Sequence, residues 1–249
     1  MHREEWELSQ KVLGREHPET LDSMHNLALA LVDLGRYDEA EKMHREEWKL
    51  TEKVMGKEHP STLTSMYNFA LVLRHLKKYG EAEQMHREEW ELSEKVLGRE
   101  HPDTLDSINA LAVVLNLMGK YGEAIRIQAQ ALEGNNRVLG KEHPSTLDSM
   151  SNFALVLHSQ GKYDEAEQMH QQVLTSRESV LGKEHPHTLF SMYSLAEVLF
   201  SKGNYGMAEQ MHRQALELRE KVLGKEHPET LASRTKFAEI SRAKEDAEN

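Results

Sequence analysis

The six prolines of this 249-residue sequence are spaced at a constant interval of 42 residues. They are Pro18, Pro60, Pro102, Pro144, Pro186 and Pro228, and Glu-His precedes each one. A glycine stands four residues before every proline, from Gly14 to Gly224. No insertion or deletion disturbs the interval. A period of this length predicts a repeat protein, in which each unit packs against its neighbours in the chain.

The first half of each period has the pattern of a helix. In the first copy, residues 18–34, proline occupies the first turn, where its missing N–H costs nothing. Leu27 and Leu31 then lie on one helical face, and Gly35 ends the helix. Other copies are apolar almost all round, as in residues 69–73. We therefore expect the first helices to be buried on several sides.

The second half of each period predicts a more charged helix that faces water. In the first copy it runs to about Met55, and the carboxylate of Asp38 is expected to cap its start. Gly56 is expected to end it in a left-handed conformation. Its predicted inward-facing residues are Ala40, Met43, Trp48 and Leu50.

These periods describe one repeat domain, 1–249, with different ends. Residues 1–17 match only the later part of a second helix and form a partial repeat, so we expect a longer array to precede them. The full repeats are 18–59, 60–101, 102–143, 144–185 and 186–227. Residues 228–249 turn polar from Arg234 onward, as a C-terminal capping helix requires. We expect that end to be the natural one.

Composition excludes several classes of protein. Only 38% of residues are hydrophobic and the net charge is −11, which suits a stack of helices whose outer faces stay wet. The absence of cysteine excludes disulfides, thiol nucleophiles and Cys-based zinc sites. There is no apolar run of the ~20 residues that cross a bilayer and no secretory signal. Acidic balance argues against nucleic acid. We expect a cytoplasmic protein that binds neither membrane nor nucleic acid.

Motifs for catalysis and metal binding are absent. The sequence has no phosphate-binding loop, no Gly-x-Ser-x-Gly and no His-Glu-x-x-His. Of its 15 histidines, six precede the prolines, and a second set is His2, His44, His86, His170 and His212. Because members of a set lie a whole repeat apart, no copy is expected to offer a compact cluster with a carboxylate. We predict structural histidines whose titration near pH 6.5 weakens the array, and no enzyme activity, metal or cofactor.

Two motifs recur along the chain: Asn26-Leu27-Ala28-x-x-Leu31 and Gly35-x-Tyr37-x-Glu39-Ala40. They resemble the tetratricopeptide repeat, and the resemblance covers the whole chain. The 42-residue period and the Gly-Lys-Glu-His-Pro turn are similar to the kinesin light chain type. Similar copies end many fungal and bacterial NOD-like receptors of the STAND ATPase class. The resemblance implies an all-α, right-handed superhelical solenoid of antiparallel helix pairs, whose first helices line a concave groove.

Two places depart from the repeat. Lys77 stands where the other copies have the turn glycine, and a left-handed conformation there would be costly for a residue with a Cβ. Gly134, Asn135 and Asn136 interrupt the third outer helix with weak helix formers. We predict that residues 130–140 are the softest part of the array in hydrogen exchange.

Positions that vary between otherwise similar first helices predict a peptide-binding surface on the groove side. One such row is His25, Tyr67, Asn109, Ser151 and Tyr193. The next row is Val32, Arg74, Asn116, His158 and Phe200. Aromatic and arginine side chains are frequent anchors in interfaces. The alternative is neutral drift on an exposed surface.

Two further sets of residues border this groove. An apolar row, which changes to Glu197 and Glu239 in the last copies, is Leu29, Leu71, Val113 and Leu155. It either seats an apolar side chain of a ligand or packs between first helices. The second set is Asn26, Asn68 and Asn152. These amides either hydrogen-bond an extended peptide or bond a neighbouring helix.

A glutamate and a tryptophan stand side by side in the second helices of the first copies. The tryptophans are Trp6, Trp48 and Trp90, and later copies have leucine there, so we expect core positions. The glutamates are Glu5, Glu47 and Glu89, where later copies have Ala131, Val173 and Ala215. An acid at a small, inward position either pairs with a neighbouring histidine or arginine or alters the stacking.

Together these features favour a non-catalytic scaffold for protein or peptide recognition, as the C-terminal sensor region of a NOD-like receptor. One alternative is a kinesin-light-chain-like cargo adaptor. The family uses its groove for short acidic peptides, whereas this groove has few cations, chiefly Arg74. The other alternative is a structural array that associates end to end through its N-terminal half-repeat.

Overall fold

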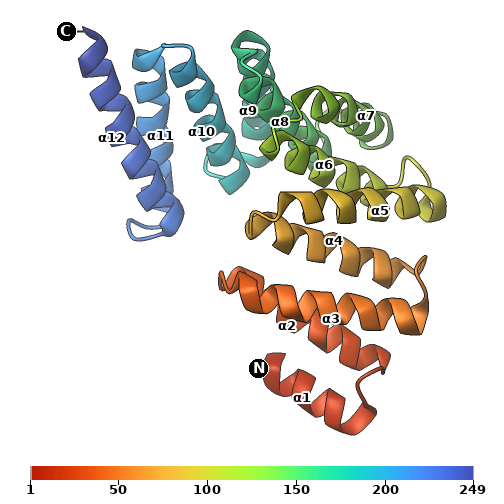
Figure 1. Cartoon of the computed structure of the whole chain (residues 1–249). Coiled ribbons are helices and arrows are strands. Elements are labelled where there is room, and N and C mark those ends of the chain that lie inside the picture. Colours follow the sequence, from red (N-terminus) through yellow and green to blue (C-terminus); the bar gives the residue numbers. More distant parts are fainter. Residues whose placement is uncertain (1, 249) are drawn as a thin grey trace. The chain divides into compact units, whose positions relative to one another are not determined.

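A computed structural model describes residues 2–248, which form twelve α-helices and no strand (Figure 1). The helices are α1 His2–Leu13, α2 Pro18–Asp33, α3 Tyr37–Met55, α4 Pro60–His75, α5 Tyr79–Leu97, α6 Pro102–Leu117, α7 Tyr121–Leu139, α8 Pro144–Ser159, α9 Tyr163–Leu181, α10 Pro186–Ser201, α11 Tyr205–Val222 and α12 Pro228–Glu248. The first helix of each pair, called the inner helix, is shorter than the second, called the outer helix, from α2 to α11. The all-α class and the helix pairs predicted by the 42-residue period are confirmed.

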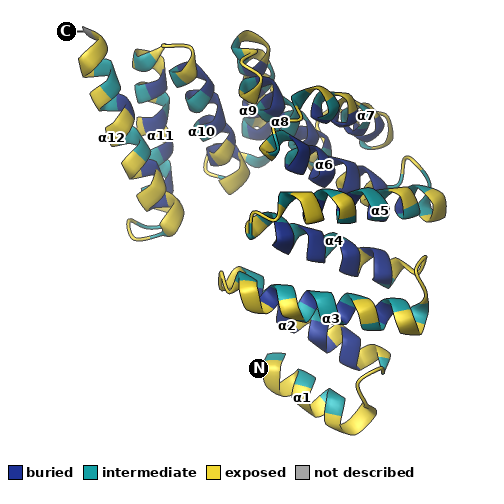
Figure 2. Ribbon diagram, in the orientation of Figure 1, coloured by how far each residue is buried: buried dark blue, intermediate teal, exposed yellow. Residues whose placement is uncertain are grey.

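The helices form two compact units, residues up to Ile127 and residues from Gln128 onward, and the division falls within α7. In the first unit each helix from α1 to α6 packs against the next, and in the second unit the same holds from α8 to α12. Figure 2 shows the buried residues concentrated on inner helices such as α4 and α6. Each unit thus builds its core by nearest-neighbour packing, as repeat proteins do.

The histidines before the prolines start the inner helices. His17 is the N-cap of α2, and its Nδ1 accepts a hydrogen bond of 3.3 Å from the backbone N–H of Glu19. The same bond recurs at the starts of α4, α6, α8, α10 and α12. It satisfies a free N–H of the first turn. The predicted turn role of these histidines is confirmed, and the imidazole acts as the cap.

The turn after each inner helix needs a positive φ. Gly35 has φ 70°, and Lys77 has φ 60°, the one non-glycine residue with positive φ among residues 2–248. The predicted departure at Lys77 is therefore confirmed. The outer helices end at a second glycine, since Gly56 is the C-cap of α3 with φ 93° and ψ 161°. Its φ is positive as predicted, but its ψ is extended rather than left-handed helical, a region used essentially by glycine alone.

Two predictions about the outer helices are wrong. Asp38 does not cap α3, because the N-cap is Arg36 and no side chain accepts a bond there. Asp38 instead lies inside the first turn, where its charge complements the helix dipole. The run of Gly134, Asn135 and Asn136 does not break α7, which is continuous to Leu139. Asn135 is buried and donates to Ser149 Oγ at 2.7 Å, which anchors this segment.

The inward face of the outer helices is more polar than predicted. In α3 the buried residues are Ala40, His44, Glu47 and Thr51, whereas Met43, Trp48 and Leu50 are only half-buried. Trp6 and Trp48 pack at the edge of hydrophobic clusters in the first unit. The hydrophobic pattern therefore identified the flank of the helix, and its central stripe carries charge.

Candidate functional site

A crevice recurs in the first unit where an outer helix meets the inner helices before and after it. The first crevice, of about 120 Å³, is lined by His25 on α2, Glu47 and Thr51 on α3, and Ser65 on α4. The second, of about 180 Å³, is lined by residues one repeat later, including Tyr67, Glu89, Ser93 and Ser107. The glutamate of each outer helix forms the floor.

The second unit has a crevice of about 450 Å³ at the corresponding place in its own repeats. Its lining includes Ser151 on α8, Arg177 on α9 and Phe190 on α10. Arg177 lies where the first unit has Thr51 and Ser93, so the floor has changed from acidic to basic.

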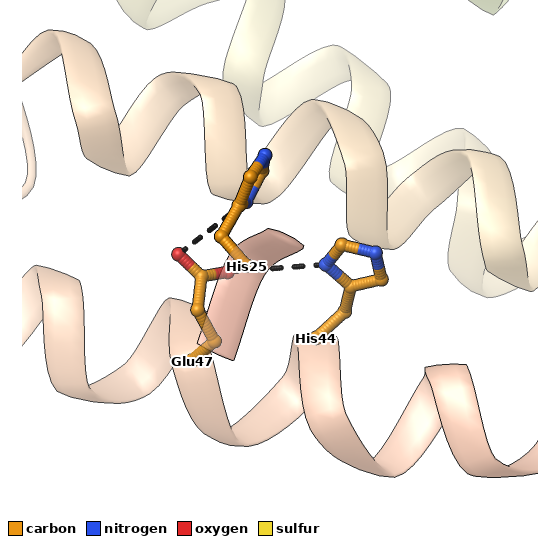
Figure 3. Close-up of side chains that lie close together, drawn as sticks. All are labelled: His25, His44 and Glu47. Carbon is orange, nitrogen blue, oxygen red and sulfur yellow. Dashed lines mark ion pairs between the residues drawn. The ribbon is translucent and has the colours of Figure 1, made fainter. Parts of the chain in front are cut away.

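The first crevice brings two histidines and a carboxylate together (Figure 3). His25 Nδ1 lies 3.7 Å from Oε1 of Glu47, and His44 Nδ1 lies 3.9 Å from Oε2. Thr51 donates a hydrogen bond of 3.2 Å to Oε1 of Glu47, which also accepts from the Ser65 hydroxyl. Burial alone would raise the pKa of Glu47. The imidazoles of His25 and His44 and the Ser65 hydroxyl lower it by more than burial raises it, so the pKa is about 2.

This cluster corrects the prediction that no repeat offers a compact group of histidine and carboxylate ligands. His25, His44 and Glu47 each present a ligand atom within 4.8 Å of the others. The prediction compared histidines along the chain within each set. It missed that His25 on an inner helix and His44 on the next outer helix face one another across the pair, with ring centroids 5.7 Å apart.

The second crevice has the same glutamate in a different environment. Glu89 accepts hydrogen bonds from Ser93 at 2.6 Å and Ser107 at 2.8 Å, and Tyr67 replaces the histidine. Burial raises the pKa of Glu89 to about 7, because the two hydroxyls offset only part of the loss of water. Burial also lowers the pKa of His86 to about 3. Glu89 is therefore a carboxyl group that changes charge near neutral pH.

In the second unit the crevice has a buried arginine, at the position of Thr51 and Ser93, and lacks the glutamate that the first unit has on its outer helices. Arg177 is 2% exposed and donates to Ser191 Oγ at 2.6 Å and to the His187 carbonyl at 3.2 Å, and it forms an ion pair with Asp148. Four residues earlier stands Val173, where the first unit has glutamate. Arg219 repeats the arrangement, because it follows Ala215 by four residues and donates to Ser233.

Two positions of the outer helix, the glutamate position and the one four residues later, therefore change together between the repeats. A serine of the following inner helix is always buried at this junction, as at Ser65, Ser107, Ser149, Ser191 and Ser233. Where the outer helix carries Glu, the residue four positions later is Thr51 or Ser93, and where it carries Ala or Val, that residue is Asn or Arg. The sequence contained this signal, since the two positions change together between copies.

The structure places the members of the first predicted groove row in different environments. His25, Tyr67 and Ser151 line the three crevices, whereas Asn109 is buried. Tyr193 is half-buried, and its ring lies 5.0 Å from that of His212 and 5.4 Å from the Arg219 guanidinium. The predicted second row is half-buried and lies outside the linings of these crevices: Val32, Arg74, Asn116, His158 and Phe200. Within it, His158 Nε2 lies 2.8 Å from Ser201 Oγ.

The residues that border the predicted groove also differ from one another. The half-buried members of the apolar row are Leu29, Leu71, Val113 and Leu155. Glu197, which ends that row, lies 3.0 Å from His212 Nε2 and 3.1 Å from Lys236 Nζ. Asn26 is exposed and Asn152 lines the second-unit crevice. Asn68 donates to the Thr64 carbonyl of its own helix at 3.1 Å rather than to a neighbouring helix.

Sequence comparison decides the family to which these helix pairs belong. Models described as tetratricopeptide repeat match residues 20–61, 70–136, 103–179, 149–221 and 188–248. The chain belongs to the tetratricopeptide repeat family. This fold is generally a non-catalytic scaffold for protein interactions. A comparison with curated protein sequences finds no match. None of the helices within residues 2–248 has the length and apolar character to cross a membrane.

Solved tetratricopeptide structures are similar to the chain. A Podosopora anserina protein with nearly identical TPR-like repeats, named after kinesin light chain, is 28% identical over 82% of this chain and 97% of its own, with a TM-score of 0.69. The quorum sensor NprR from B. thuringiensis is 17% identical over 95% and 63%, with a TM-score of 0.72. A Rap protein complexed with Competence and Sporulation Factor is 14% identical over 99% and 75%, with a TM-score of 0.67. The last two share the fold alone.

Proposed function

We propose that this tetratricopeptide array is a non-catalytic scaffold that recognises a protein or peptide through the crevices at its repeat junctions. The observation that supports the proposal is the contrast between the buried residues of each junction, which recur, and the residues that line its crevice, which vary. Buried threonine and serine recur at every junction, as at Thr62 and Ser65. The side chains that face the crevices change from copy to copy, which is the pattern of a fixed scaffold with variable recognition groups.

The charges of the crevices favour particular ligand groups. Acidic side chains line both crevices of the first unit, including Asp22 beside Glu47 and Asp103 beside Glu89. A cationic side chain or a free amino group complements them. The crevice of the second unit holds Arg177, but its guanidinium already contacts Asp148 and Ser191. We therefore infer a preference for basic segments in the first unit, in contrast to the acidic peptides of kinesin light chains.

The rigidity of the scaffold supports the same function. Helices that pack in the chain present their side chains at fixed spacing before a ligand arrives. A ligand then loses mainly its own conformational freedom on binding, which favours affinity. A structure with the same fold is a complex with Competence and Sporulation Factor, and another is a quorum sensor, so ligand recognition is compatible with this architecture.

For the biological context, we infer the C-terminal sensor region of a cytoplasmic NOD-like receptor. The near-identity of the 42-residue copies supports this inference, because repeats of this type are found at the ends of such receptors. The kinesin-light-chain-like cargo adaptor is the second candidate, and the 28% identical protein named after kinesin light chain favours it. The sequence upstream of Met1 discriminates the two, since an NTPase domain there indicates a receptor and a coiled coil indicates an adaptor.

End-to-end self-association is a third candidate because α1 presents exposed apolar side chains. Leu8 is 63% exposed and Val12 is 69% exposed. Light scattering over a concentration series tests it. A constant monomer mass supports a binding module, whereas a mass that grows with concentration and falls in the double variant Leu8→Lys, Val12→Lys supports association.

The experiment for peptide recognition selects ligands from a random peptide-display library on the whole chain. Hydrogen exchange of the chain with a selected peptide then locates the binding surface. We expect slower exchange in the N-terminal halves of α4 and α6, around Tyr67 and Ser107, and an excess of Lys and Arg in the selected peptides. Protection confined to the outer faces of α3 and α5 would place recognition elsewhere.

A further inference from the structure

We propose that His25, His44 and Glu47 form a binding site for a divalent transition-metal ion such as Zn²⁺. The site lies between α2, which supplies His25, and α3, which supplies His44 and Glu47 three residues apart (Figure 3). Within residues 2–248, these are the three histidine or acidic side chains that each offer a ligand atom within 4.8 Å of the other two. It requires no peptide ligand and so stands apart from the proposed function.

The donor set fits a metal of this class. Two imidazoles with one carboxylate are the protein ligands of many open zinc sites, in which a fourth position holds water or another ligand. Imidazole nitrogen favours Zn²⁺, Ni²⁺ and Cu²⁺, whereas Mg²⁺ and Ca²⁺ prefer oxygen ligands alone. The crevice that His25 and Glu47 line gives the fourth position access to water.

The ligand atoms must move closer together before one metal ion can bind all three. Metal bonds of about 2.0–2.1 Å in a tetrahedral site place the ligand atoms roughly 3.3 Å apart. The three ligand atoms lie within 4.8 Å of one another. The contacts with the carboxylate are 3.7 Å from His25 Nδ1 to Oε1 and 3.9 Å from His44 Nδ1 to Oε2, so the two histidines approach different oxygens. His25 is the least buried of the three, so rotation of its side chain toward Oε2 is the movement that the site requires.

Buried polar atoms that lack partners are the second observation that indicates a ligand. His44 is 0% exposed and Glu47 is 3% exposed. Both ring nitrogens of His44 and Oε2 of Glu47 have no hydrogen-bond partner. Buried donors and acceptors are normally satisfied, and a metal ion bound to Nδ1 and Oε2 would satisfy two of these three atoms.

The remaining oxygen of the carboxylate is held by the surrounding shell. Thr51 and Ser65 both donate to Oε1 of Glu47. Hydrogen bonds of this kind orient a ligating carboxylate and raise metal affinity. They direct Oε2 toward the imidazole of His44, so the first repeat has both the ligands and the support that a metal site needs.

The other repeats provide natural controls because each lacks at least one ligand. The second repeat keeps His86 and Glu89 but has Tyr67 in place of His25. The fourth and fifth keep the histidine of the outer helix, but Val173 and Ala215 replace the glutamate. The site is therefore expected in the first repeat alone, with one equivalent of metal per chain.

The experiment titrates the untagged whole chain with Zn²⁺ by calorimetry, and with Co²⁺ by absorption, because tetrahedral Co²⁺ has intense visible bands. We compare wild type with His25→Tyr, which installs the residue of the second repeat and preserves the fold. We also prepare Tyr67→His, which completes the set in the second repeat. The surface control is His187→Gln, since His187 is exposed and lies in the other unit.

The expected result is one saturable equivalent in wild type and in His187→Gln, at least tenfold weaker binding in His25→Tyr, and two equivalents in Tyr67→His. Zn²⁺ should also raise the melting temperature of wild type but not of His25→Tyr, because a ligand stabilises the state that binds it. Equal affinity in wild type and His25→Tyr would overturn the proposal. So would the absence of saturable binding in wild type, or a single equivalent in Tyr67→His.

Discussion

Nδ1 of His25 lies 3.7 Å from Oε1 of Glu47, a contact that the matching glutamate of the next repeat lacks. In the next repeat Glu89 has the same two hydroxyl partners, Ser93 and Ser107, but Tyr67 replaces the histidine. The pKa of Glu47 falls to about 2, although burial opposes that shift, whereas burial raises the pKa of Glu89 to about 7. The two glutamates therefore differ in pKa, with His25 and His44 beside Glu47 and Tyr67 in place of the first histidine beside Glu89.

Glu89 should make the first unit less stable as the pH rises. Its pKa is about 7 when folded against a model value of 4.5, so the folded state binds the proton more tightly between these values. This contribution is present below pH 4.5 and is lost as the pH rises through 7. Glu89→Gln should therefore stabilise the chain at pH 8, by up to about 3 kcal/mol, and by much less at pH 4. Urea denaturation at both pH values measures this, and an equal effect at both would contradict it.

His170 should have the opposite pH dependence. Burial lowers its pKa to about 4, and His158 and Arg177 add to the shift. The unfolded chain therefore takes up the proton first, so stability is full above about pH 6.5 and falls as the pH approaches 4. His170→Gln installs the residue that the third repeat has at this position, Gln128. The variant should lose less stability than wild type between pH 7 and pH 4 in thermal melts, and parallel curves would exclude this role for His170.

Lys77→Gly should stabilise the protein. Lys77 has φ 60°, a conformation that costs a residue with a Cβ about 1 kcal/mol, and a glycine adopts it without strain. Part of the gain is offset because glycine is more flexible when unfolded. We expect a net increase of roughly 0.5 kcal/mol in the free energy of unfolding. Gly119→Lys, in the matching turn of the next repeat, should reduce stability, and a gain in that variant would refute the argument.

Arg177 should be essential to the second unit, and its loss should be rescued by the acidic arrangement of the first unit. Arg177→Ser removes the guanidinium that Ser191 and Asp148 contact, at a cost of about 2 kcal/mol. Adding Val173→Glu recreates the Glu, Ser and Ser set of Glu89, so the double variant should recover part of that loss. Chemical denaturation compares the two, with Lys183→Ala as an exposed control. A double variant less stable than Arg177→Ser would show that the two positions are not coupled.

The sequence was sufficient for the helices because their boundaries depend on local signals. Proline at the first turn and glycine in the connecting turns set the ends of α2 and α3, and the strain at Lys77 followed from the missing glycine. The sequence marked Glu47 as an acid at an inward position, and a histidine neighbour was one of the two alternatives. The structure confirms that alternative. The burial of His44 was not predicted, because a search for apolar periodicity does not count a histidine as inward-facing.

The pairing of His25 with Glu47 required the structure, since it depends on how α2 and α3 cross. Glu197 and Lys236 show the same limit, because they belong to different repeats yet lie 3.1 Å apart. Side-chain positions on one helix follow from its period, whereas contacts between helices depend on their rotation. The groove rows were therefore only partly predictable, and His25, Tyr67 and Ser151 are the members that line crevices.

The dissociation constant of a display-selected peptide tests recognition at the repeat junctions most directly. It is measured by calorimetry on wild type, on Tyr67→Ser, and on Gln84→Ala as an exposed control on the outer helix α5. Serine is the natural residue at the corresponding position of the fourth repeat, Ser151, so the variant should fold. We expect at least tenfold weaker binding in Tyr67→Ser and unchanged binding in Gln84→Ala. Equal affinity in Tyr67→Ser and wild type, with a loss in Gln84→Ala, would contradict it.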